Sequence, residues 1–444
     1  MGEGFHTRSL HAGQEPDPAT GARAPPIYQT TSYVFEDADR AADLYALDAD
    51  GDVYSRISNP TTRTLEDRLA SLEGGSGAVA TASGMAALDA VTTALASAGD
   101  NVVAAADTYG GTATYLGPFV ERRGVEARTV ETLDYDAYAE AIDDDTAFVH
   151  VETIANPSLV TPDFERLADL AHEHAVPLVV DNTFATPALC RPIDHGADVV
   201  WESTTKWLHG SGTTVGGVVV DGGTFPWDHA DADYPLVTGD HPGYERDFVE
   251  RFGDAAFAAA VRHRAVRTSG GSQSPFDAWQ TIQGLETLPI RMARHCENAA
   301  TVAAFLDEHD AVSWVNYPGL ESHETHAEAT AYLDGGIGND TSAGGTSAGG
   351  YGGMVTFGLA DGYTAAKRVC ESVELASLLA NVGDAKTLVI HPASTTHAQL
   401  SEKAQAAAGV TPEMVRLSVG LEDPEDVVAD LGRALDRASA PDDR

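Results

Sequence analysis

Cysteine is scarce in this chain of 444 residues, which contains only Cys190, Cys296 and Cys370. An odd number of cysteines, far apart and outside any paired motif, excludes a disulfide framework and a cysteine-based zinc site. We expect the three thiols to be small members of a hydrophobic core in a reducing compartment, and we expect no metal site.

Long apolar runs are also missing from the chain. No stretch is long enough to cross a membrane, and residues 1–6 contain no apolar signal region. We therefore expect a soluble, cytoplasmic protein.

Positively charged residues are also few. The chain has 27 Lys and Arg but 68 Asp and Glu, which gives a net charge of -41. The acidic residues are spread along the chain, and such a surface disfavours nucleic acid and anionic membranes as partners. High charge is typical of disorder, but a hydrophobic content of 43% and regular apolar runs indicate a folded protein.

We interpret this charge as adaptation to high intracellular salt, which screens the repulsion between surface carboxylates. The midpoint of thermal unfolding is therefore expected to rise as potassium chloride is added. A midpoint that stayed constant or fell with added salt would contradict this interpretation.

Lysine is the rarest charged residue, at positions 206, 367, 386 and 403. The last three lie in polar helix-like or turn-like contexts, whereas Lys206 follows an apolar run and stands between hydroxyls and Trp207. Poor solvation at a strand end lowers the pKa of an amine and makes it a nucleophile, so a plain surface role is disfavoured. Hydroxyls at Ser203 and Thr205 suit a phosphate, and a reactive lysine beside a phosphate is what pyridoxal phosphate requires.

Helical and extended patterns alternate through the middle of the chain. We expect helices over 62–73, 85–98, 111–122 and 162–174, and strands over 101–105, 146–152, 177–180, 198–202 and 215–220. This order predicts an α/β fold with a mostly parallel sheet covered by helices on both faces. Ligands of such sheets gather at the carboxyl ends of strands, where six polar residues fall: Glu152, Asn156, Asp181, Ser203, Thr205 and Lys206.

The chain divides into three predicted parts. Residues 1–60 form an extended arm that needs a surface to lie on, often another subunit. Residues 61–265 form the large domain, in which 221–262 is predicted to be a surface excursion. Residues 266–444 form a smaller α+β domain, with a flexible Gly-rich loop over 335–353. Its expected helices are 273–308 (broken at Pro289), 364–379 and 424–438, and its expected strands 312–317, 354–359, 387–390 and 414–419.

A glycine-rich stretch runs from Gly74 to Met85. It lacks the third glycine of a dinucleotide-binding fingerprint, which disfavours a dehydrogenase, and it is no P-loop. Ser83-Gly84-Met85 opens a helix whose first amides suit a phosphate, although close packing of helix on strand also explains the glycine.

Three further residues carry candidate chemistry. Asp181 ends a strand and suits a pyridine nitrogen, with a helix N-cap as the alternative. Tyr109 suits stacking on an aromatic cofactor and proton transfer, or it is simply an aromatic at a helix start. Arg416 lies in an apolar strand and needs an anion, either a substrate carboxylate or a structural ion-pair partner.

These motifs together resemble the Cys/Met-metabolism family of fold type I pyridoxal-phosphate enzymes. The resemblance covers residue 5 to the C-terminus, and it rests on Tyr54 to Thr61, Ser83 to Met85, Glu152 to Pro157, Asp181 to Phe184, Ser203 to Lys206, His391 to Ser394 and Arg416. It implies a Schiff base at Lys206, a carboxylate at the ring nitrogen from Asp181 and a stacked Tyr109. It implies further cofactor contacts from Ser83, Gly84, Met85, Asn156, Thr183, Ser203 and Thr205, and substrate contacts from Asn381 and Arg416.

The same resemblance implies an oligomer. Tyr54 and Arg56 would reach the phosphate of a neighbouring subunit, in an active dimer that is usually paired into a tetramer.

Within the family the chain is most similar to O-acetylhomoserine sulfhydrylases, by the segment 221–262 and by the segment from Ala380 to His391. Methionine γ-lyases resemble it less, because they tend to carry a cysteine where Gly111 stands and a serine where Asn381 stands. The expected reaction is γ-replacement on an activated homoserine by sulfide. Cystathionine γ-synthase and γ-lyase stay open as alternatives, as does a non-catalytic regulator, which would not need Lys206, Asp181 and Arg416 together.

Overall fold

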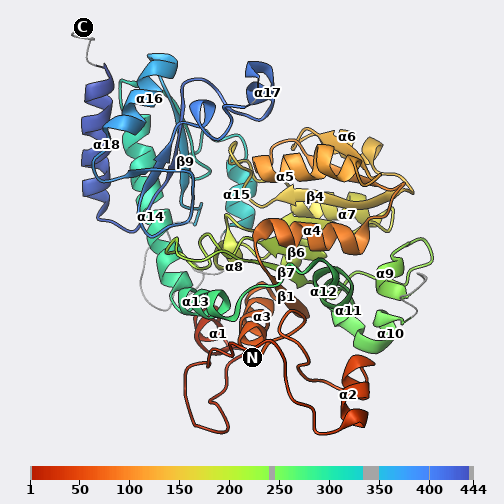
Figure 1. Ribbon diagram of the computed structural model, residues 1–444. Coiled ribbons are helices and arrows are strands. Elements are labelled where there is room, and N and C mark those ends of the chain that lie inside the picture. Colours follow the sequence, from red (N-terminus) through yellow and green to blue (C-terminus); the bar gives the residue numbers. More distant parts are fainter. Residues whose placement is uncertain (1–2, 240–245, 334–349, 400, 440–444) are drawn as a thin grey trace.

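The computed structural model of the protein describes residues 3–239, 246–333, 350–399 and 401–439. They form a seven-stranded sheet and a five-stranded sheet, and the long helix α14 (Leu288–Asp307) contacts elements on both sides (Figure 1). The predicted α/β class, with a large mostly parallel sheet and a smaller α+β unit, is confirmed. The domain boundaries near residues 60 and 265 stay predictions.

The larger sheet has the strand order β1-β7-β6-β5-β4-β2-β3. All its strands run in one direction except β7, which lies antiparallel between β1 and β6. The strands are short and rich in Val and Ala, as expected for a sheet covered on both faces. Their bounds are β1 (Gly77–Thr81), β2 (Asn101–Ala105), β3 (Glu126–Val130), β4 (Thr146–Glu152), β5 (Leu178–Asp181), β6 (Val199–Glu202) and β7 (Gly217–Asp221).

Helices cover both faces of this sheet, so that two hydrophobic cores form. Successive strand residues point to opposite faces, and Val200 of β6 belongs to the first core while Val199 and Trp201 belong to the second. The first core includes α3 (Pro60–Glu73), α6 (Tyr135–Ala141), α7 (Phe164–His172), α8 (Thr186–Leu189) and α13 (Pro275–Leu285). The second includes α4 (Gly84–Leu95) and α11 (Ala256–Ala260).

The segment over residues 221–262 was predicted to be a surface excursion, and this is wrong for much of its described part. Its aromatic residues Phe225, Trp227 and Phe257 are buried in the second core. The rings of Trp227 and Phe257 stack, with centroids 4.9 Å apart and planes 13° from parallel. Polar residues, Gly and Pro separate these side chains irregularly in the sequence, so no helical or strand period reveals them.

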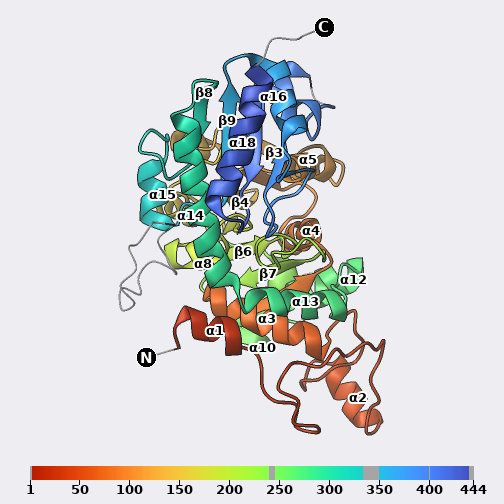
Figure 2. The ribbon, with the colours of Figure 1, turned by 90° about the vertical axis from the view of Figure 1, so that its left-hand side faces the viewer.

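The smaller sheet has the order β10-β11-β12-β9-β8. Its strands are β8 (Val312–Asn316), β9 (Met354–Leu359), β10 (Ser377–Leu378), β11 (Leu388–Ile390) and β12 (Met414–Ser418). Helices α14, α16 (Gly362–Ser372) and α18 (Pro424–Ser439) pack together over it (Figure 2). The helical break predicted at Pro289 is confirmed, because α13 ends at Leu285 and Pro289 lies in the first turn of α14.

A helix predicted over 364–379 ends earlier, at Ser372. The carboxylate of Asp430 on α18 accepts hydrogen bonds from the amides of Glu374, Leu375 and Ala376. This contact with a residue far along the chain turns the backbone away from the helix and into β10.

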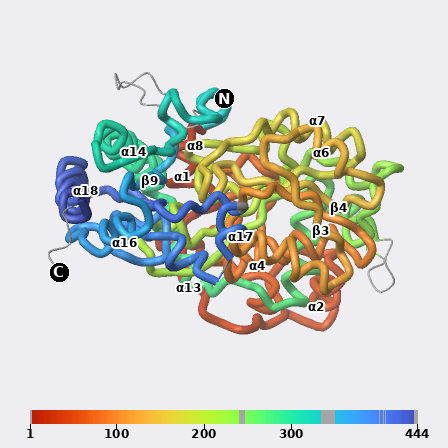
Figure 3. Tube along the Cα trace, turned by 90° about the horizontal axis from the view of Figure 1, so that it is seen from above, coloured from red at the N-terminus to blue at the C-terminus, as the bar shows by residue number. Residues whose placement is uncertain are grey.

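Shorter helices fill the remaining connections: α5 (Gly110–Thr114), α9 (Pro235–Thr238), α10 (Phe248–Phe252), α12 (Arg267–Ser269), α15 (His326–Tyr332) and α17 (Glu402–Ala407). Seen from above, α17 lies between the two units (Figure 3). The chain after it approaches the end of β2, since a Cβ on Gly409 would lie 3.9 Å from Oδ1 of Asp107. Of the predicted Gly-rich loop, residues 335–349 lie outside the described part of the chain. No helix within the described ranges has the length and apolarity to cross a membrane.

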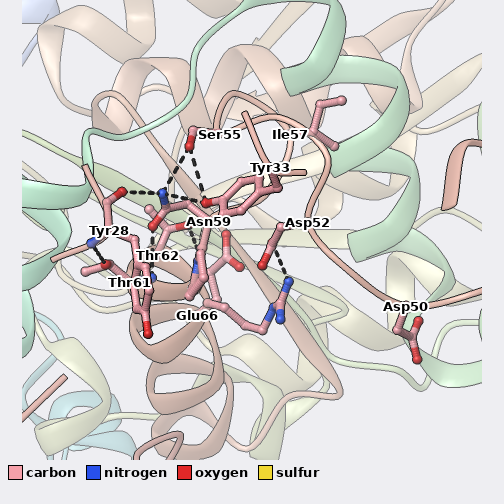
Figure 4. A network of polar contacts seen from close by, with 12 residues as sticks. Tyr28, Tyr33, Asp50, Asp52, Ser55, Ile57, Asn59, Thr61, Thr62 and Glu66 are labelled. Carbon is pink, nitrogen blue, oxygen red and sulfur yellow. Dashed lines mark hydrogen bonds and ion pairs between the residues drawn. The ribbon is translucent and has the colours of Figure 1, made fainter. Parts of the chain in front are cut away.

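The N-terminal arm was predicted to be extended, but it contains two short helices, α1 (Phe5–His11) and α2 (Ala38–Tyr45). The side-chain amide of Asn59 ties it to α3 by donating to the carbonyl of Tyr28 at 2.8 Å and to the hydroxyls of Tyr33 and Ser55 at 3.1 Å each (Figure 4). The arm is therefore tied to its own chain at the start of α3, although most of its residues are exposed.

Candidate functional site

The carboxyl ends of three neighbouring parallel strands form the centre of the site. In the sheet register, Glu152 of β4 lies opposite Asp181 of β5, and Asp181 lies opposite Trp201 of β6. Lys206 follows β6 after a turn in which its amide donates to the carbonyl of Ser203 at 3.2 Å. The predicted strand-end residues are thus brought to one edge of the sheet.

The side chain of Lys206 reaches across to the smaller unit. Its Nζ donates a hydrogen bond of 2.5 Å to Oδ1 of Asn381, so the structure joins two predicted site residues that lie far apart in the sequence. Burial, with the positive charge of Arg416 nearby, lowers the pKa of Lys206 to about 8. An amine with such a pKa is neutral in a useful fraction of molecules near neutral pH and can act as a base.

Arg291 of α14 fixes the backbone that follows this lysine. Its guanidinium donates to the carbonyls of Trp207 at 2.7 Å, Leu208 at 3.1 Å and Gly284 at 2.8 Å. Sequence reasoning missed this residue, because its partners are backbone carbonyls that no pattern of side chains reveals. The only signal that the sequence offers for Arg291 is its charge, because its neighbours in the predicted helix are apolar.

Asp181 is buried, with 7% of its surface exposed. Its Oδ1 accepts a hydrogen bond of 2.9 Å from the amide of Thr183, and the hydroxyl of Thr183 accepts one of 2.8 Å from the amide of Ser203. Burial raises the pKa of Asp181 to about 7. The alternative of a helix N-cap fails, because the N-cap of α8 is Ala185.

Ser83, Gly84 and Met85 meet the lysine turn at the start of α4. Ser83 is the N-cap of this helix, and its hydroxyl accepts a hydrogen bond of 3.1 Å from the amide of Ala86. A Cβ on Gly84 would lie 2.8 Å from the Cβ of Ser203, so only glycine permits this approach. The first amides of a helix lack partners within it, and here they face the hydroxyl-rich turn.

Thr205 is engaged with the neighbouring strand. Its hydroxyl accepts from the amide of Gly216 at 3.0 Å and lies 3.2 Å from the carbonyl of the same residue. Its single hydroxyl proton is therefore directed at a carbonyl, and Thr205 must release that contact before it can donate to a phosphate.

Glu152 connects Tyr109 to Asn156. One carboxylate oxygen accepts from the amide of Tyr109 at 2.6 Å, and the other accepts from the amide of Asn156 at 2.9 Å. Burial and the charge of Asp181 raise the pKa of Glu152 well above its usual value. Sequence reasoning placed Glu152 at the strand end without giving it a role. The signal was present, since a glutamate closes an otherwise apolar strand.

Arg416 lies on β12 with 8% of its surface exposed. Its guanidinium donates a hydrogen bond of 3.1 Å to Oδ1 of Asn156, and no ion pair of Arg416 occurs among the residues that the structure describes. The structural ion pair weighed as an alternative is thus not found in this part of the chain. Burial lowers the pKa of Arg416 to about 10, as expected for a cation without a paired anion.

Tyr54 and Arg56 are the predicted residues that the structure does not bring to this site. Tyr54 is 41% exposed, and the guanidinium of Arg56 lies 5.3 Å from the centre of its ring. Arg56 also donates to the carbonyl of Arg267. In a single subunit both side chains lie outside the group around Lys206.

The residues of this site fit pyridoxal phosphate. A buried carboxyl suits a ring nitrogen, an amine of lowered pKa suits the aldehyde, and the cradle at Gly84, which a Cβ would fill, suits the phosphate. Tyr109, with 49% of its surface exposed, is accessible to stack on the ring.

Known proteins resemble the chain over nearly its whole length. The family model described as Cys/Met metabolism PLP-dependent enzyme matches residues 6–436. A homocysteine synthase from Schizosaccharomyces pombe is 47% identical over 98% of this chain and 99% of its own. O-acetyl-L-homoserine sulfhydrylase 1 from Thermus thermophilus is 48% identical over 97% of this chain and 99% of its own.

A solved structure also resembles the fold of this chain over its whole length. It is a putative O-acetylhomoserine (thiol)-lyase from Campylobacter jejuni, in which a lysine carries pyridoxyl 5'-monophosphate. It has a TM-score of 0.91 and 37% identity, and the match covers 98% of this chain and 100% of that one. Because this family model matches residues 6–436, the chain belongs to the Cys/Met-metabolism family of pyridoxal-phosphate-dependent enzymes.

Proposed function

We propose that the protein converts O-acetyl-L-homoserine and sulfide to L-homocysteine and acetate, in the biosynthesis of methionine and other sulfur amino acids. The observation that carries the proposal is the lysine Lys206, which has a lowered pKa, contacts Asn381 and lies near the buried Arg416. The full-length similarity to enzymes named for this reaction supports the choice of substrate.

Pyridoxal phosphate, when bound, supplies an electron sink for bonds broken at the α-carbon of the amino acid. Asp181 holds a proton at the ring nitrogen, because a buried carboxylate stabilises an adjacent cation. Tyr109 would stack on the ring and assist proton transfer. Thr183 orients Asp181, and Ser203, Thr205 and the cradle formed by Ser83, Gly84 and Met85 would hold the phosphate.

Lys206 is the base of the reaction. Its amine removes the proton at the α-carbon of the substrate and then removes a proton at the β-carbon. Loss of this second proton lets acetate leave the γ-carbon, and sulfide then adds there. Asn381 orients the amine through the hydrogen bond to Nζ. The neutral fraction implied by a pKa of about 8 makes the amine available near neutral pH.

Arg416 binds the α-carboxylate of the substrate. A guanidinium donates two parallel hydrogen bonds to a carboxylate, and burial strengthens them. Asn156 holds the guanidinium from one side, and Glu152 fixes the backbone of Asn156. The binding site for the amino acid thus combines residues from both units of the chain.

The proposed assembly is a dimer, usually paired into a tetramer, that works in the cytoplasm. Tyr54 and Arg56 are proposed to reach the phosphate site of a neighbouring subunit. Both side chains are exposed in this subunit, and Arg56 contacts Tyr54 and the carbonyl of Arg267, which supports that placement. The residues 1–60, 61–265 and 266–444 are proposed as arm, large domain and C-terminal domain.

Product identification tests the reaction. The purified protein, in high salt with pyridoxal phosphate, receives O-acetylhomoserine with sulfide and, separately, with cysteine, and the products are identified by mass. Homocysteine from sulfide with little product from cysteine is the expected result. Cystathionine as the main product would make the protein a γ-synthase, and 2-ketobutyrate without an acceptor would make it a γ-lyase, so either would overturn the proposal.

A further inference from the structure

Two glutamates that the proposed reaction does not use are buried together behind Asp181. Glu73 is the last residue of α3 and Glu202 is the last residue of β6, and both are 0% exposed. Glu202 belongs to the same strand face as Val200, so it points to the first core, toward α3. Ser203, the next residue, points to the opposite face and meets Gly84.

The partners of the two carboxyls are unequal. Oε1 of Glu73 accepts a hydrogen bond of 2.8 Å from Nδ2 of Asn182. Neither oxygen of Glu202, nor Oε2 of Glu73, accepts a hydrogen bond from a donor group elsewhere in the described part of the chain. The two carboxyls are within hydrogen-bonding reach of each other.

Such a pair requires one proton. Two carboxylates without other donors cannot both stay ionised in a dry interior, because burial and mutual repulsion each disfavour the second charge. Glu73 already accepts from an amide, so it is the ionised member. Glu202 is then the neutral member and donates its proton to Glu73, which also satisfies the remaining oxygen of Glu73.

The two glutamates are connected to the cofactor site through Asn182, which directly follows Asp181 in the sequence. The amide group of Asn182 donates to Glu73 and to the carbonyl of Cys190 at 2.9 Å, and its Oδ1 accepts from the hydroxyl of Thr153 at 2.8 Å. Its backbone amide donates to the carbonyl of Trp201. The peptide that carries Asp181 is therefore fixed by a side chain whose charged acceptor is Glu73.

We propose that Glu73 and Glu202 are positioning residues for Asp181, which share a single proton and hold Asn182 in place beneath it. Because Glu202 is neutral, the site contains one buried negative charge and not two. The ionised Glu73 is a strong hydrogen-bond acceptor for the side-chain amide of Asn182. This role rests on the cofactor site alone, so it stands whichever acceptor thiol the enzyme uses.

Other ionisable groups face the pair from two neighbouring segments, the end of β5 and residues 190–194. Arg191 and Asp194, which follow α8, act on Glu73 with opposite signs, and Asp181 raises the proton affinity of Glu202. Burial and the charge of Glu73 raise the pKa of the Cys190 thiol. Burial and the charge of Glu73 raise the pKa of Glu202 well above its usual 4.5. Since the folded state holds this proton more tightly than the unfolded state, the proton on Glu202 favours folding most below pH 4.5, and its contribution falls as pH rises above that value.

The test uses the full-length protein in high salt and compares Glu202→Gln, Glu202→Leu and the wild type. The glutamine side chain is neutral and still donates to Glu73, whereas leucine does not. The infrared difference spectrum of wild type minus Glu202→Gln should contain the carbonyl band of a protonated carboxyl, which shifts in heavy water. The fall in unfolding midpoint between pH 5 and 8 should be smaller for Glu202→Gln than for the wild type.

Cofactor affinity tests the positioning role separately from turnover. Titration with pyridoxal phosphate should give Glu202→Gln a Kd within about threefold of the wild type and should weaken Glu202→Leu by about tenfold or more. Asp430→Asn is the matched control, because buried Asp430 accepts from the amides of Glu374, Leu375 and Ala376 and has a lowered pKa, so its amide variant should lower the midpoint throughout pH 5 to 8 and leave cofactor affinity unchanged.

A missing carboxyl band, or an unchanged pH profile in Glu202→Gln, would refute the shared proton. Wild-type affinity in Glu202→Leu would refute the positioning role. Both results leave the proposed reaction unaffected, because product identification does not depend on them.

Discussion

Replacing Lys206 by alanine is expected to lower turnover by at least about 10³-fold, because the variant loses both the amine that attaches the cofactor and the base that moves protons. The side chain of Lys206 is the only amine among the site residues, and Asn381 orients it. Steady-state rates of homocysteine formation, with the absorbance of the bound cofactor as a second readout, provide the measurement.

The stability of the same variant has a predicted sign. The pKa of Lys206 is lowered to about 8 by burial, so the folded state binds the proton of this amine less tightly than the unfolded state. The charged amine therefore costs stability below pH 8, and that cost disappears as pH rises toward 10.5. Without cofactor, the Lys206→Ala protein should unfold at the wild-type temperature or above it at pH 7.

Lys386→Ala is the matched control for this prediction, because the side chain of Lys386 is 73% exposed and its amine lies 3.8 Å from Asp384. It should retain normal turnover. Normal turnover in Lys206→Ala would contradict the assignment of the base.

Replacing Arg416 by methionine is expected to lower kcat/KM by about 10²-fold, since a charged hydrogen-bonding group is worth about 1.5–3 kcal/mol. The loss should fall mainly on KM for the amino acid if Arg416 binds its carboxylate in the ground state. Affinity for pyridoxal phosphate should stay close to that of the wild type, because the partner of Arg416 is Asn156 and not a group of the phosphate cradle.

The stability of Arg416→Met should not fall in proportion to its activity. A buried guanidinium with a pKa lowered to about 10 is itself costly, and methionine fills similar space without a charge. Arg291→Met is the matched comparison, since Arg291 satisfies three backbone carbonyls and its loss should lower the unfolding midpoint clearly. An Arg416→Met variant with unchanged KM would contradict carboxylate binding.

The strand-end residues could be predicted because parallel sheets place functional groups at their carboxyl ends. Asp181 and Lys206 each follow an apolar strand in the sequence, and the structure puts those strands side by side. The strands over 101–105 and 146–152 were predicted with their observed bounds, since short apolar runs between helices are distinctive.

Contacts between distant segments account for what could not be predicted. The end of α16 depends on a contact with Asp430, and the turn that carries Lys206 depends on a contact with Arg291. Neither contact can be read from the local sequence. The prediction that the segment over 221–262 lies on the surface was wrong for its aromatic residues, because aromatic packing such as that of Trp227 on Phe257 needs no regular spacing. Glu73 and Glu202 are 129 residues apart, and only the fold brings them together.

The central claim is that Lys206 moves protons at two carbons of the substrate, so that a group on the third can be replaced. The most direct test is to run the reaction of O-acetylhomoserine with sulfide in heavy water and to locate deuterium in the homocysteine by mass and magnetic resonance. Deuterium at both the α-carbon and the β-carbon is the predicted result, because the lysine amine exchanges its protons with solvent between the two transfers. Homocysteine without deuterium at the β-carbon would mean direct displacement at the γ-carbon and would contradict the account.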